Sequence, residues 1–236
     1  MMMTRLFSLA DQEPAPGLYA RMARLRVFRQ IYQRLGEDLA AVLPQQAYLL
    51  DVGTGPGYLL GFLTASRADL KPVGLDLSYQ MLRQGRRFAG FTSREPFWAV
   101  VGKAQALPFT ANTFHHVLAT FSLHHWNKPS LGLTEINRVL KPNGKAWILE
   151  LNPQAPRAEV RHFAECLKTP WLPLYLGYKL TSWHSALGAA DFALILKDSG
   201  ITDWCLDVVH HIFFRLEWTK TALNEDSPSQ CRNHLP

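Results

Sequence analysis

An apolar run that leads into a glycine-rich loop constrains the fold of this chain more than any other stretch. It reads LLDVGTGPGYLL over residues 49–60, with three glycines in five positions and Asp51 shortly before them. The apolar residues before the loop predict a buried strand, and YLLGFLTASR after it predicts a helix. A strand, a glycine loop and a helix in this order are typical of a parallel sheet that binds a nucleotide-like ligand at the loop.

The alternation of strands and helices continues to residue 151. Further strands are predicted at PVGLDL, FWAVVG, FHHVLAT and KAWILEL, and helices at SYQMLRQGRRFA, with Ser78 as N-cap, and PSLGLTEINRVL, ended by Pro142 and Gly144. A helix at ALGAADFALILKDSG and two β-rich runs, ITDWCLDVV and HIFFRLEWT, follow. Only a short turn separates these runs, which favours an antiparallel hairpin. The predicted fold class is α/β: a doubly wound, mostly parallel seven-stranded sheet with an antiparallel C-terminal hairpin and a helical cap.

The segments outside the alternation divide the chain into a core and additions to it. Apolar residues recur at helical spacing from Leu18 to Leu43, and Gly36 is expected to divide this stretch into two helices. The predicted divisions are an N-terminal helical segment that contributes to the substrate cap, the main ligand-binding domain, a cap insertion within it, and a disordered tail: residues 1–44, 45–223, 152–184 and 224–236.

The bulk composition narrows the class of protein only modestly. The formal net charge is +6, and arginines between residues 21 and 34 contribute to it. A solvated helix face explains them, and attraction to nucleic acid or to a membrane surface is the alternative. The apolar runs are too short to span a bilayer, and the first residues do not read as a signal peptide. Three scattered cysteines indicate neither a disulfide framework nor a zinc site, so a cytoplasmic protein without a metal is expected.

The loop departs from the dinucleotide-binding fingerprint in two ways. The fingerprint requires G-x-G-x-x-G, but Tyr58 stands where its last glycine would fall. The carboxylate of Asp51 would repel a pyrophosphate and would suit a cationic ligand. S-adenosylmethionine has that chemistry, because it carries a sulfonium and an ammonium and no phosphate. Asp76 follows Gly57 by nineteen residues, close to the spacing at which an acidic residue binds a ribose diol.

At this point the chain resembles the class I S-adenosylmethionine-dependent methyltransferases, in particular the group with quinone C-methyltransferases and other small-molecule methyltransferases. The segments that carry the resemblance, in family order, are LLDVGTGPG, GLDLS, GKAQALPF, TFSLHHW and EINRVLKPNGKAWILE. The resemblance implies a Rossmann-like fold, S-adenosyl-L-methionine as cofactor, and methyl transfer to a small molecule by in-line displacement. The cofactor-binding residues that we predict are Asp51, Gly53, Thr54, Gly55, Gly57, Asp76, Leu77, Ala104, Gln105 and Phe121.

Two residues depart from the family pattern. Lys103 stands where the family usually has an Asp that accepts from the adenine amino group, and lysine cannot accept a hydrogen bond. Adenine would then be held by groups near Ala104 and Gln105 and by Leu77. His115 replaces an Asp at the start of the fourth strand, where an effect on local packing is expected.

His124 and His125 follow the fourth strand, where the family places its substrate, and they are the predicted catalytic residues. A neutral imidazole can accept a proton near neutral pH. The alternative is that they only shape the pocket or contact the cofactor. A substrate lid is expected from aromatic residues of the cap, which simple packing would explain equally well: Tyr19, Phe28, Tyr32, Trp171, Tyr175, Tyr178 and Trp183.

Other functions remain open alongside a small-molecule methyltransferase. An RNA or protein methyltransferase would fit the basic charge, although FSLHHW stands where amino-methylating enzymes of nucleic acids carry a Pro-Pro-aromatic motif. A non-catalytic binding protein with this fold would fit the change at Lys103. A dehydrogenase is disfavoured by Asp51 and Tyr58. The sequence leaves the oligomeric state open.

Overall fold

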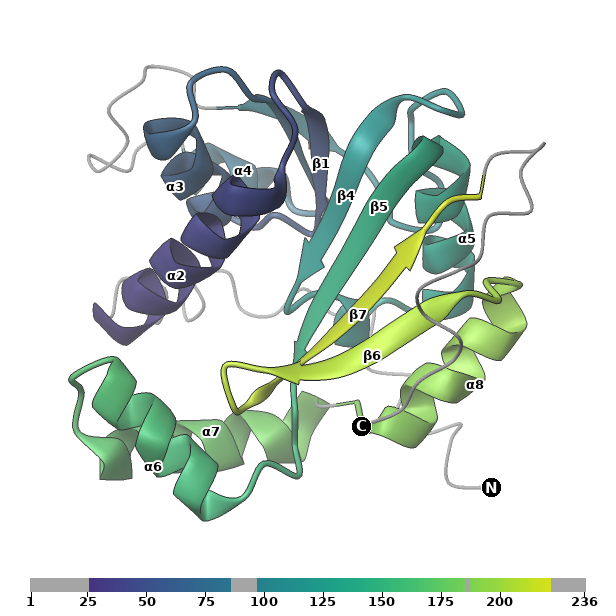
Figure 1. The fold of residues 1–236 in the computed structure, drawn as a ribbon. Coiled ribbons are helices and arrows are strands. Elements are labelled where there is room, and N and C mark those ends of the chain that lie inside the picture. The colour runs from purple at the N-terminus through teal and green to yellow at the C-terminus, as the bar shows by residue number, and fades with distance from the viewer. Residues whose placement is uncertain (1–25, 86–96, 186, 222–236) are drawn as a thin grey trace.

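The computed structural model describes residues 26–85, 97–185 and 187–221 (Figure 1). These residues form a seven-stranded sheet with the order β3-β2-β1-β4-β5-β7-β6. Its strands are β1 Tyr48–Val52, β2 Lys71–Asp76, β3 Trp98–Val101, β4 Phe114–Thr120, β5 Leu140–Leu151, β6 Trp204–Val209 and β7 Phe213–Thr219. The first five are parallel, whereas β7 runs antiparallel to β5 and to β6. The predicted sheet and its C-terminal hairpin are confirmed.

Helices pack on both faces of the sheet. They are α2 Arg26–Val42, α3 Tyr58–Ser66, α4 Tyr79–Gly85, α5 Pro129–Val139, α6 Arg157–Cys166, α7 Trp171–Ser185 and α8 Ala189–Ser199. Successive residues of a strand point to opposite faces. In β1, Leu50 therefore belongs to a core with α5 and α8, and Leu49 belongs to a second core with α2 and α3. Two separate cores on one sheet make the fold doubly wound, as predicted.

Gly36 does not divide the N-terminal helix, so that part of the prediction was wrong. The helix α2 runs without a break through Gly36, which is buried. A Cβ at Gly36 would lie 3.3 Å from the Cβ of Phe62 in α3. The glycine therefore lets two helices approach closely, and this contact offsets its poor helix propensity. The predicted helical residues before Arg26 lie outside the described residues.

The junction of α5 and β5 also differs from the prediction. The helix ends at Val139, and the strand begins at Leu140 instead of Lys145. Leu140 pairs with Phe114, and the register then shifts before His116 pairs with Lys145. Pro142 and Gly144 therefore lie within an irregular strand and not in a loop, because backbone pairing to β4 holds the segment.

The insertion before the last two strands is helical, as expected of a cap. Figure 1 shows α6 and α7 beside one end of the sheet, below α2. Val160 and Phe163 of α6 pack into the core that contains α2 and α3. The predicted domain boundaries stay predictions, and the tail at 224–236 lies outside the described residues.

Two further findings bear on the expectations from composition. No helix in the described ranges is long and apolar enough to cross a membrane. Cys166 is a free, exposed thiol, whereas Cys205 is disulfide-bonded. The scattered spacing of the cysteines did not indicate this disulfide.

Candidate functional site

The glycine loop lies between β1 and α3 at the carboxyl end of the parallel strands. Gly53, Gly55 and Gly57 have φ angles of 77°, 56° and 76°, which L-residues with a side chain rarely adopt. The loop is held by its neighbour β2, because the N–H groups of Gly53 and Thr54 both donate to the Leu75 carbonyl oxygen, at 2.7 and 3.0 Å. Parallel sheets of this kind bind ligands at this edge.

Two of the glycines make room for protein side chains. A Cβ on Gly53 would lie 2.5 Å from the Cβ of Ser122, and one on Gly57 would lie 2.1 Å from Cζ of Phe97. The Ser122 hydroxyl also donates to the Val52 carbonyl oxygen at 2.8 Å, which ties the ends of β1 and β4 together. The sequence predicted ligand approach at these glycines, and the structure shows that packing of the chain itself also requires them.

We expect Gly53→Ala to lower the free energy of unfolding by about 2–4 kcal/mol, because the new methyl group meets Ser122 at a positive φ. Urea unfolding of the purified protein measures the effect. Gly177→Ala is the matched control, since a Cβ there meets nothing within 4 Å. An equal loss of stability in both variants would contradict the role of the Gly53–Ser122 contact.

Asp51 is a buried carboxylate next to this loop. The residue is only 2% exposed, and its Oδ2 accepts from the Thr54 hydroxyl at 2.7 Å. Oδ1 is buried and has no hydrogen-bond partner among the described residues. Burial raises the pKa of Asp51 to about 7, the charge of Asp76 adds to the rise, and the Thr54 hydrogen bond opposes it. The site therefore favours a cation that would stabilise the ionised form.

Asp76, at the end of β2, connects the loop to the next turn. Its Oδ2 accepts from the Gly55 N–H at 2.7 Å, and its Oδ1 accepts from the Ser78 N–H at 2.8 Å. Leu77 beside it is 50% exposed. Ser78 caps α4 as predicted, because its hydroxyl accepts from the Met81 N–H at 3.4 Å.

The segment predicted to lie beside adenine follows β3. Its first residue, Gly102, donates its N–H to the Asp76 carbonyl oxygen at 3.0 Å, which places the segment next to β2. Lys103 is exposed and pairs with Ala106 through the backbone, while Ala104 is buried. Hydrogen bonds thus bring Asp51 to Thr54, and Asp76 to Gly55. The segment with Ala104 and Gln105 is placed near them by the backbone hydrogen bond between Gly102 and Asp76.

Phe121 follows β4 and has a φ of 54°. Its N–H donates to the Leu149 carbonyl oxygen at 2.8 Å, and its ring lies 6.3 Å from that of Tyr32 and 5.2 Å from that of Phe213. The ring therefore joins α2 to the sheet.

His115, predicted to affect local packing, accepts at Nδ1 from the Tyr48 N–H at 2.9 Å.

His124 and His125 lie in a 3₁₀ turn, Leu123–His125, directly after this segment. His124 Nδ1 is 2.7 Å from Oε2 of Glu150, and Oε1 of Glu150 accepts from the Leu123 N–H at 2.7 Å. Glu150 is 1% exposed. A carboxylate only accepts, so Nδ1 of His124 carries the proton and the lone pair of the neutral ring lies on Nε2.

The two histidines have opposite electrostatics. Burial lowers the pKa of His124, but the charge of Glu150 and the hydrogen bond to it outweigh burial, so the pKa is raised overall. For His125, burial and the neighbouring charge of His124 lower the pKa to about 4, against the opposing charge of Glu150. The structure thus makes His124 the stronger base of the predicted pair. Sequence reasoning missed Glu150, although an acidic residue within the apolar strand KAWILEL was a signal for it.

The aromatic residues predicted as a lid divide into two groups. Tyr32 and Tyr178 are buried, and the Tyr178 hydroxyl donates to the Asn152 carbonyl oxygen at 2.7 Å, so both serve packing. Trp171 and Tyr175 are half-buried, and the Arg157 guanidinium lies 4.8 Å and 5.6 Å from their ring centroids. Tyr19 and the side chain of Trp183 lie outside the described residues.

The fold is shared with known methyltransferases. A solved structure of an S-adenosylmethionine-dependent methyltransferase from Aquifex aeolicus aligns over 89% of this chain and 100% of its own, with a TM-score of 0.66 and 18% identity. Residues 50–148 match the family described as methyltransferase domain.

Proteins related in sequence are also methyltransferases. A ubiquinone/menaquinone biosynthesis C-methyltransferase UbiE from Desulfotalea psychrophila is 34% identical over 187 residues, which are 73% of this chain and 71% of the relative. A malonyl-[acyl-carrier protein] O-methyltransferase from Legionella pneumophila is 34% identical over 137 residues, 57% of this chain and 46% of that protein. The chain belongs to the family of S-adenosylmethionine-dependent methyltransferases. It spans about half the length of several curated relatives, with shares of 46%, 48% and 43%.

Proposed function

We propose that this protein transfers a methyl group from S-adenosyl-L-methionine to a small-molecule acceptor by in-line displacement. The observation that carries the proposal is Asp51, a buried carboxylate at the glycine loop with a pKa raised to about 7 and an unpartnered Oδ1 among the described residues. Such a group fits the cationic cofactor of the family. A phosphate-bearing cofactor would add a second negative charge beside it.

The residues proposed to hold the cofactor are those predicted from the sequence. Asp51 would bind a donor of the methionine part, and Asp76 would accept from the ribose hydroxyls. Leu77, Ala104 and Gln105 would contact the adenine, and Lys103 would contribute only its backbone. When bound, the cofactor supplies an electrophilic methyl group on a sulfonium.

We further propose that His124 accepts the proton of the acceptor and that Glu150 is its positioning residue. The contact between His124 Nδ1 and Glu150 Oε2, at 2.7 Å, fixes the ring and leaves Nε2 as the basic nitrogen. His125, with a pKa lowered to about 4, stays neutral and is too weak a base for this role. It would shape the pocket beside His124.

The small-molecule assignment is supported by the names of the relatives, which act on quinone precursors or on malonyl-acyl-carrier protein. A nucleic-acid or protein acceptor is disfavoured, because its main support is the basic net charge. A cytoplasmic location stays a prediction, and the disulfide at Cys205 is atypical of a reducing compartment.

The proposal is tested by calorimetric titration with S-adenosylmethionine, followed by transfer of a labelled methyl group to a demethylated quinol and to malonyl-acyl-carrier protein. We expect micromolar cofactor binding, about 8 kcal/mol, and label in a small-molecule product. Binding without transfer to any acceptor from a metabolite extract would favour a non-catalytic binding protein. Label in bulk RNA or protein alone would replace the small-molecule acceptor, and absent binding at about 1 mM would overturn the proposal.

A further inference from the structure

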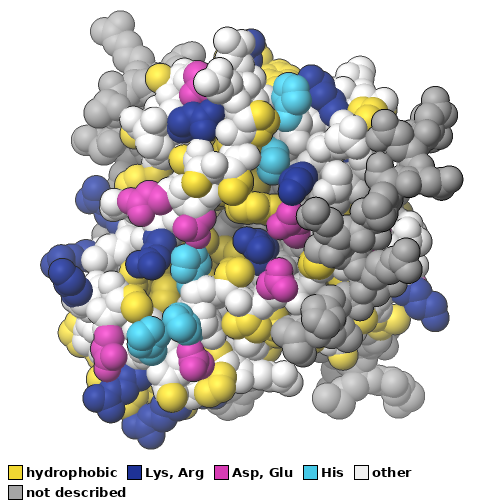
Figure 2. Space-filling model, viewed as in Figure 1, with side chains coloured by type: hydrophobic (Ala, Val, Ile, Leu, Met, Phe, Trp, Pro, Cys, Tyr) yellow, Lys and Arg dark blue, Asp and Glu magenta, His cyan; other side chains and the backbone are white. Residues whose placement is uncertain are grey.

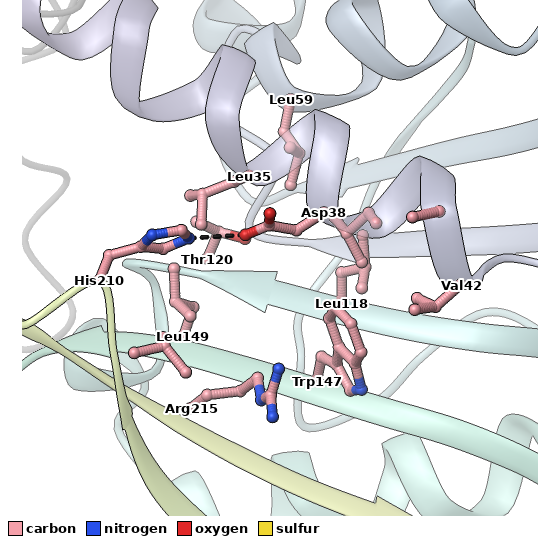
Figure 3. A pocket seen from close by; sticks show the side chains of 13 residues that line it. Leu35, Asp38, Val42, Leu59, Leu118, Thr120, Trp147, Leu149, His210 and Arg215 are labelled. Atoms are coloured by element: carbon pink, nitrogen blue, oxygen red, sulfur yellow. Dashed lines mark hydrogen bonds and ion pairs between the residues drawn. The ribbon is translucent and has the colours of Figure 1, made fainter. Parts of the chain in front are cut away.

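A cavity lies between α2 and the strands β4, β5 and β7. Figure 3 shows α2 above Leu118 and Leu149, with the cavity between the helix and these strands. The strand register places Leu118 beside Trp147, and Leu149 beside Arg215. Figure 1 shows that no described helix crosses in front of β5 and β7 in this view.

The first part of the cavity, which we call the apolar chamber, has a volume of about 420 Å³. Leucines from α2, α3 and the sheet line it: Leu35, Leu39, Leu59, Leu118 and Leu149. Its one side is closed by an ion pair of 2.6 Å between His210 Nε2 and Asp38 Oδ2, which joins the β6–β7 turn to α2 (Figure 3). The volume is in the range of small-molecule sites.

The second part, which we call the basic mouth, has a volume of about 620 Å³ and lies at the amino ends of β4 and β5. It shares Val42, Trp147 and Arg215 with the apolar chamber, so the two parts meet there. Charged residues lining the mouth are Lys141, Lys145, Arg215 and Glu217. Asp207 lies beside Arg215 as well, so three cationic side chains face two carboxylates and an excess of positive charge remains. Figure 2 shows basic, acidic and histidine side chains with hydrophobic atoms between them on this face of the molecule.

Ion pairs hold two of these cations, Lys145 and Arg215, only loosely, and Lys141 Nζ lies 3.0 Å from His115 Nε2. Lys145 Nζ is 3.4 Å from Oε1 of Glu217, and Arg215 Nε is 3.7 Å from Oε2 of the same residue. Arg215 Nη2 is 3.5 Å from Oδ2 of Asp207. These distances exceed those of strong charge-assisted hydrogen bonds, so the cations keep donors for a further acceptor.

Buried polar atoms at the same place lack partners among the described residues. His116 is 5% exposed, lines the mouth, and has neither ring nitrogen hydrogen-bonded. The indole Nε1 of Trp147 is buried and unpartnered as well, and this nitrogen can only donate. The Arg215 guanidinium lies 5.0 Å from the Trp147 ring centroid. Unpaired buried polar groups are costly, so an acceptor at this point would be favoured.

We propose that this cavity binds a small amphipathic anion, with its apolar body in the leucine-lined chamber and its carboxylate or phosphate head among Trp147, Arg215, Lys141 and Lys145. The head group would lie at the amino end of β5, where Lys141 and Lys145 stand, whereas the proposed methyl-transfer site lies at the carboxyl ends of the strands. The proposal therefore does not depend on the proposed function.

The test is calorimetric titration of the full chain with decanoate, decyl phosphate, decanol and decyltrimethylammonium. We expect one or both anions to bind, with decanol and the cation at least about tenfold weaker. Preference for decanoate or for decyl phosphate identifies the head group. No binding of either anion at about 1 mM, or equal binding of decanol, would overturn the proposal.

Variants separate the site from unspecific adsorption. We expect Lys141→Gln with Lys145→Gln to weaken anion binding about tenfold, and Trp147→Phe to weaken it while keeping an aromatic ring in place. Lys71→Gln removes one positive charge and is the control for Lys141→Gln and Lys145→Gln made singly, because Lys71 is exposed at the start of β2 on the same edge of the sheet. Circular dichroism checks that each variant is folded. Equal weakening by Lys71→Gln, or none in the other variants, would contradict the proposal.

Discussion

Replacing Asp51 with Asn is expected to stabilise the free protein and, at the same time, to weaken its binding of S-adenosylmethionine. Burial raises the pKa of this carboxyl from 3.8 to about 7. The folded pKa lies above the unfolded value. The protein therefore has its full stability below pH 3.8, where Asp51 is neutral in both states, and it loses stability as the pH rises towards 7. At pH 8 the ionised carboxylate therefore destabilises the fold, and its removal should add about 2–4 kcal/mol to the free energy of unfolding.

Urea unfolding at several pH values measures this gain in stability. The gain should be largest at pH 8 and should shrink as the pH falls towards 3.8, the unfolded pKa of Asp51. Cofactor affinity should fall about 30-fold or more, because a cation loses its buried partner. Wild-type affinity should also decline below about pH 7, where Asp51 takes up a proton, whereas the affinity of Asp51→Asn should not.

Asp69→Asn is a control with the opposite sign. This exposed carboxylate binds Arg67, and that hydrogen bond is the main reason its pKa is lowered. Its removal should reduce stability at pH 8 and leave cofactor binding unchanged. Unchanged cofactor affinity in Asp51→Asn would contradict the role of Asp51 in binding, and unchanged stability at pH 8 would contradict the cost of its charge.

The sequence predicted the sheet and the proximity of Asp51 to Asp76 because both depend on local patterns. Apolar runs of strand length and closely spaced glycines identify β1 and its loop, and the carboxyl ends of neighbouring parallel strands place Asp51 near Asp76. These features require no knowledge of contacts between distant segments.

The errors and omissions arise from contacts through space. Gly36 reads as a helix breaker until Phe62, 26 residues later, is packed against it. Ser122 and Phe97 fill the space beside glycines of the loop, and neither belongs to the loop's motif. Glu150 becomes part of the site only because β5 lies beside β4, which brings its carboxylate to His124.

Replacement of Glu150 by Gln should lower turnover about 10²-fold and should move the pH dependence of turnover to lower pH. As a base, His124 must be neutral, so turnover should rise with pH through the raised pKa of this residue. In Glu150→Gln the charge that raises this pKa is removed and the effect of burial remains, so the midpoint should fall below that of the wild type. A merely structural role of Glu150 would reduce activity without moving the midpoint.

Histidine variants complete the test with the acceptor found by labelling. His124→Gln should lower turnover by about 10²–10³-fold with little change in the KM of the cofactor, because a base acts in the transition state. His125→Gln should cost far less, since burial and the charge of His124 keep the pKa of His125 near 4 and its basicity low. The stability of each variant separates turnover from folding. The ion pair of His124 with Glu150 stabilises the fold fully below the unfolded pKa of 6.5, and this contribution is lost as the pH rises through the raised folded pKa. Well above that pH the ion pair no longer contributes to stability, so turnover compared there reports on catalysis and not on folding. Unchanged turnover of His124→Gln at that pH would exclude His124 as the base.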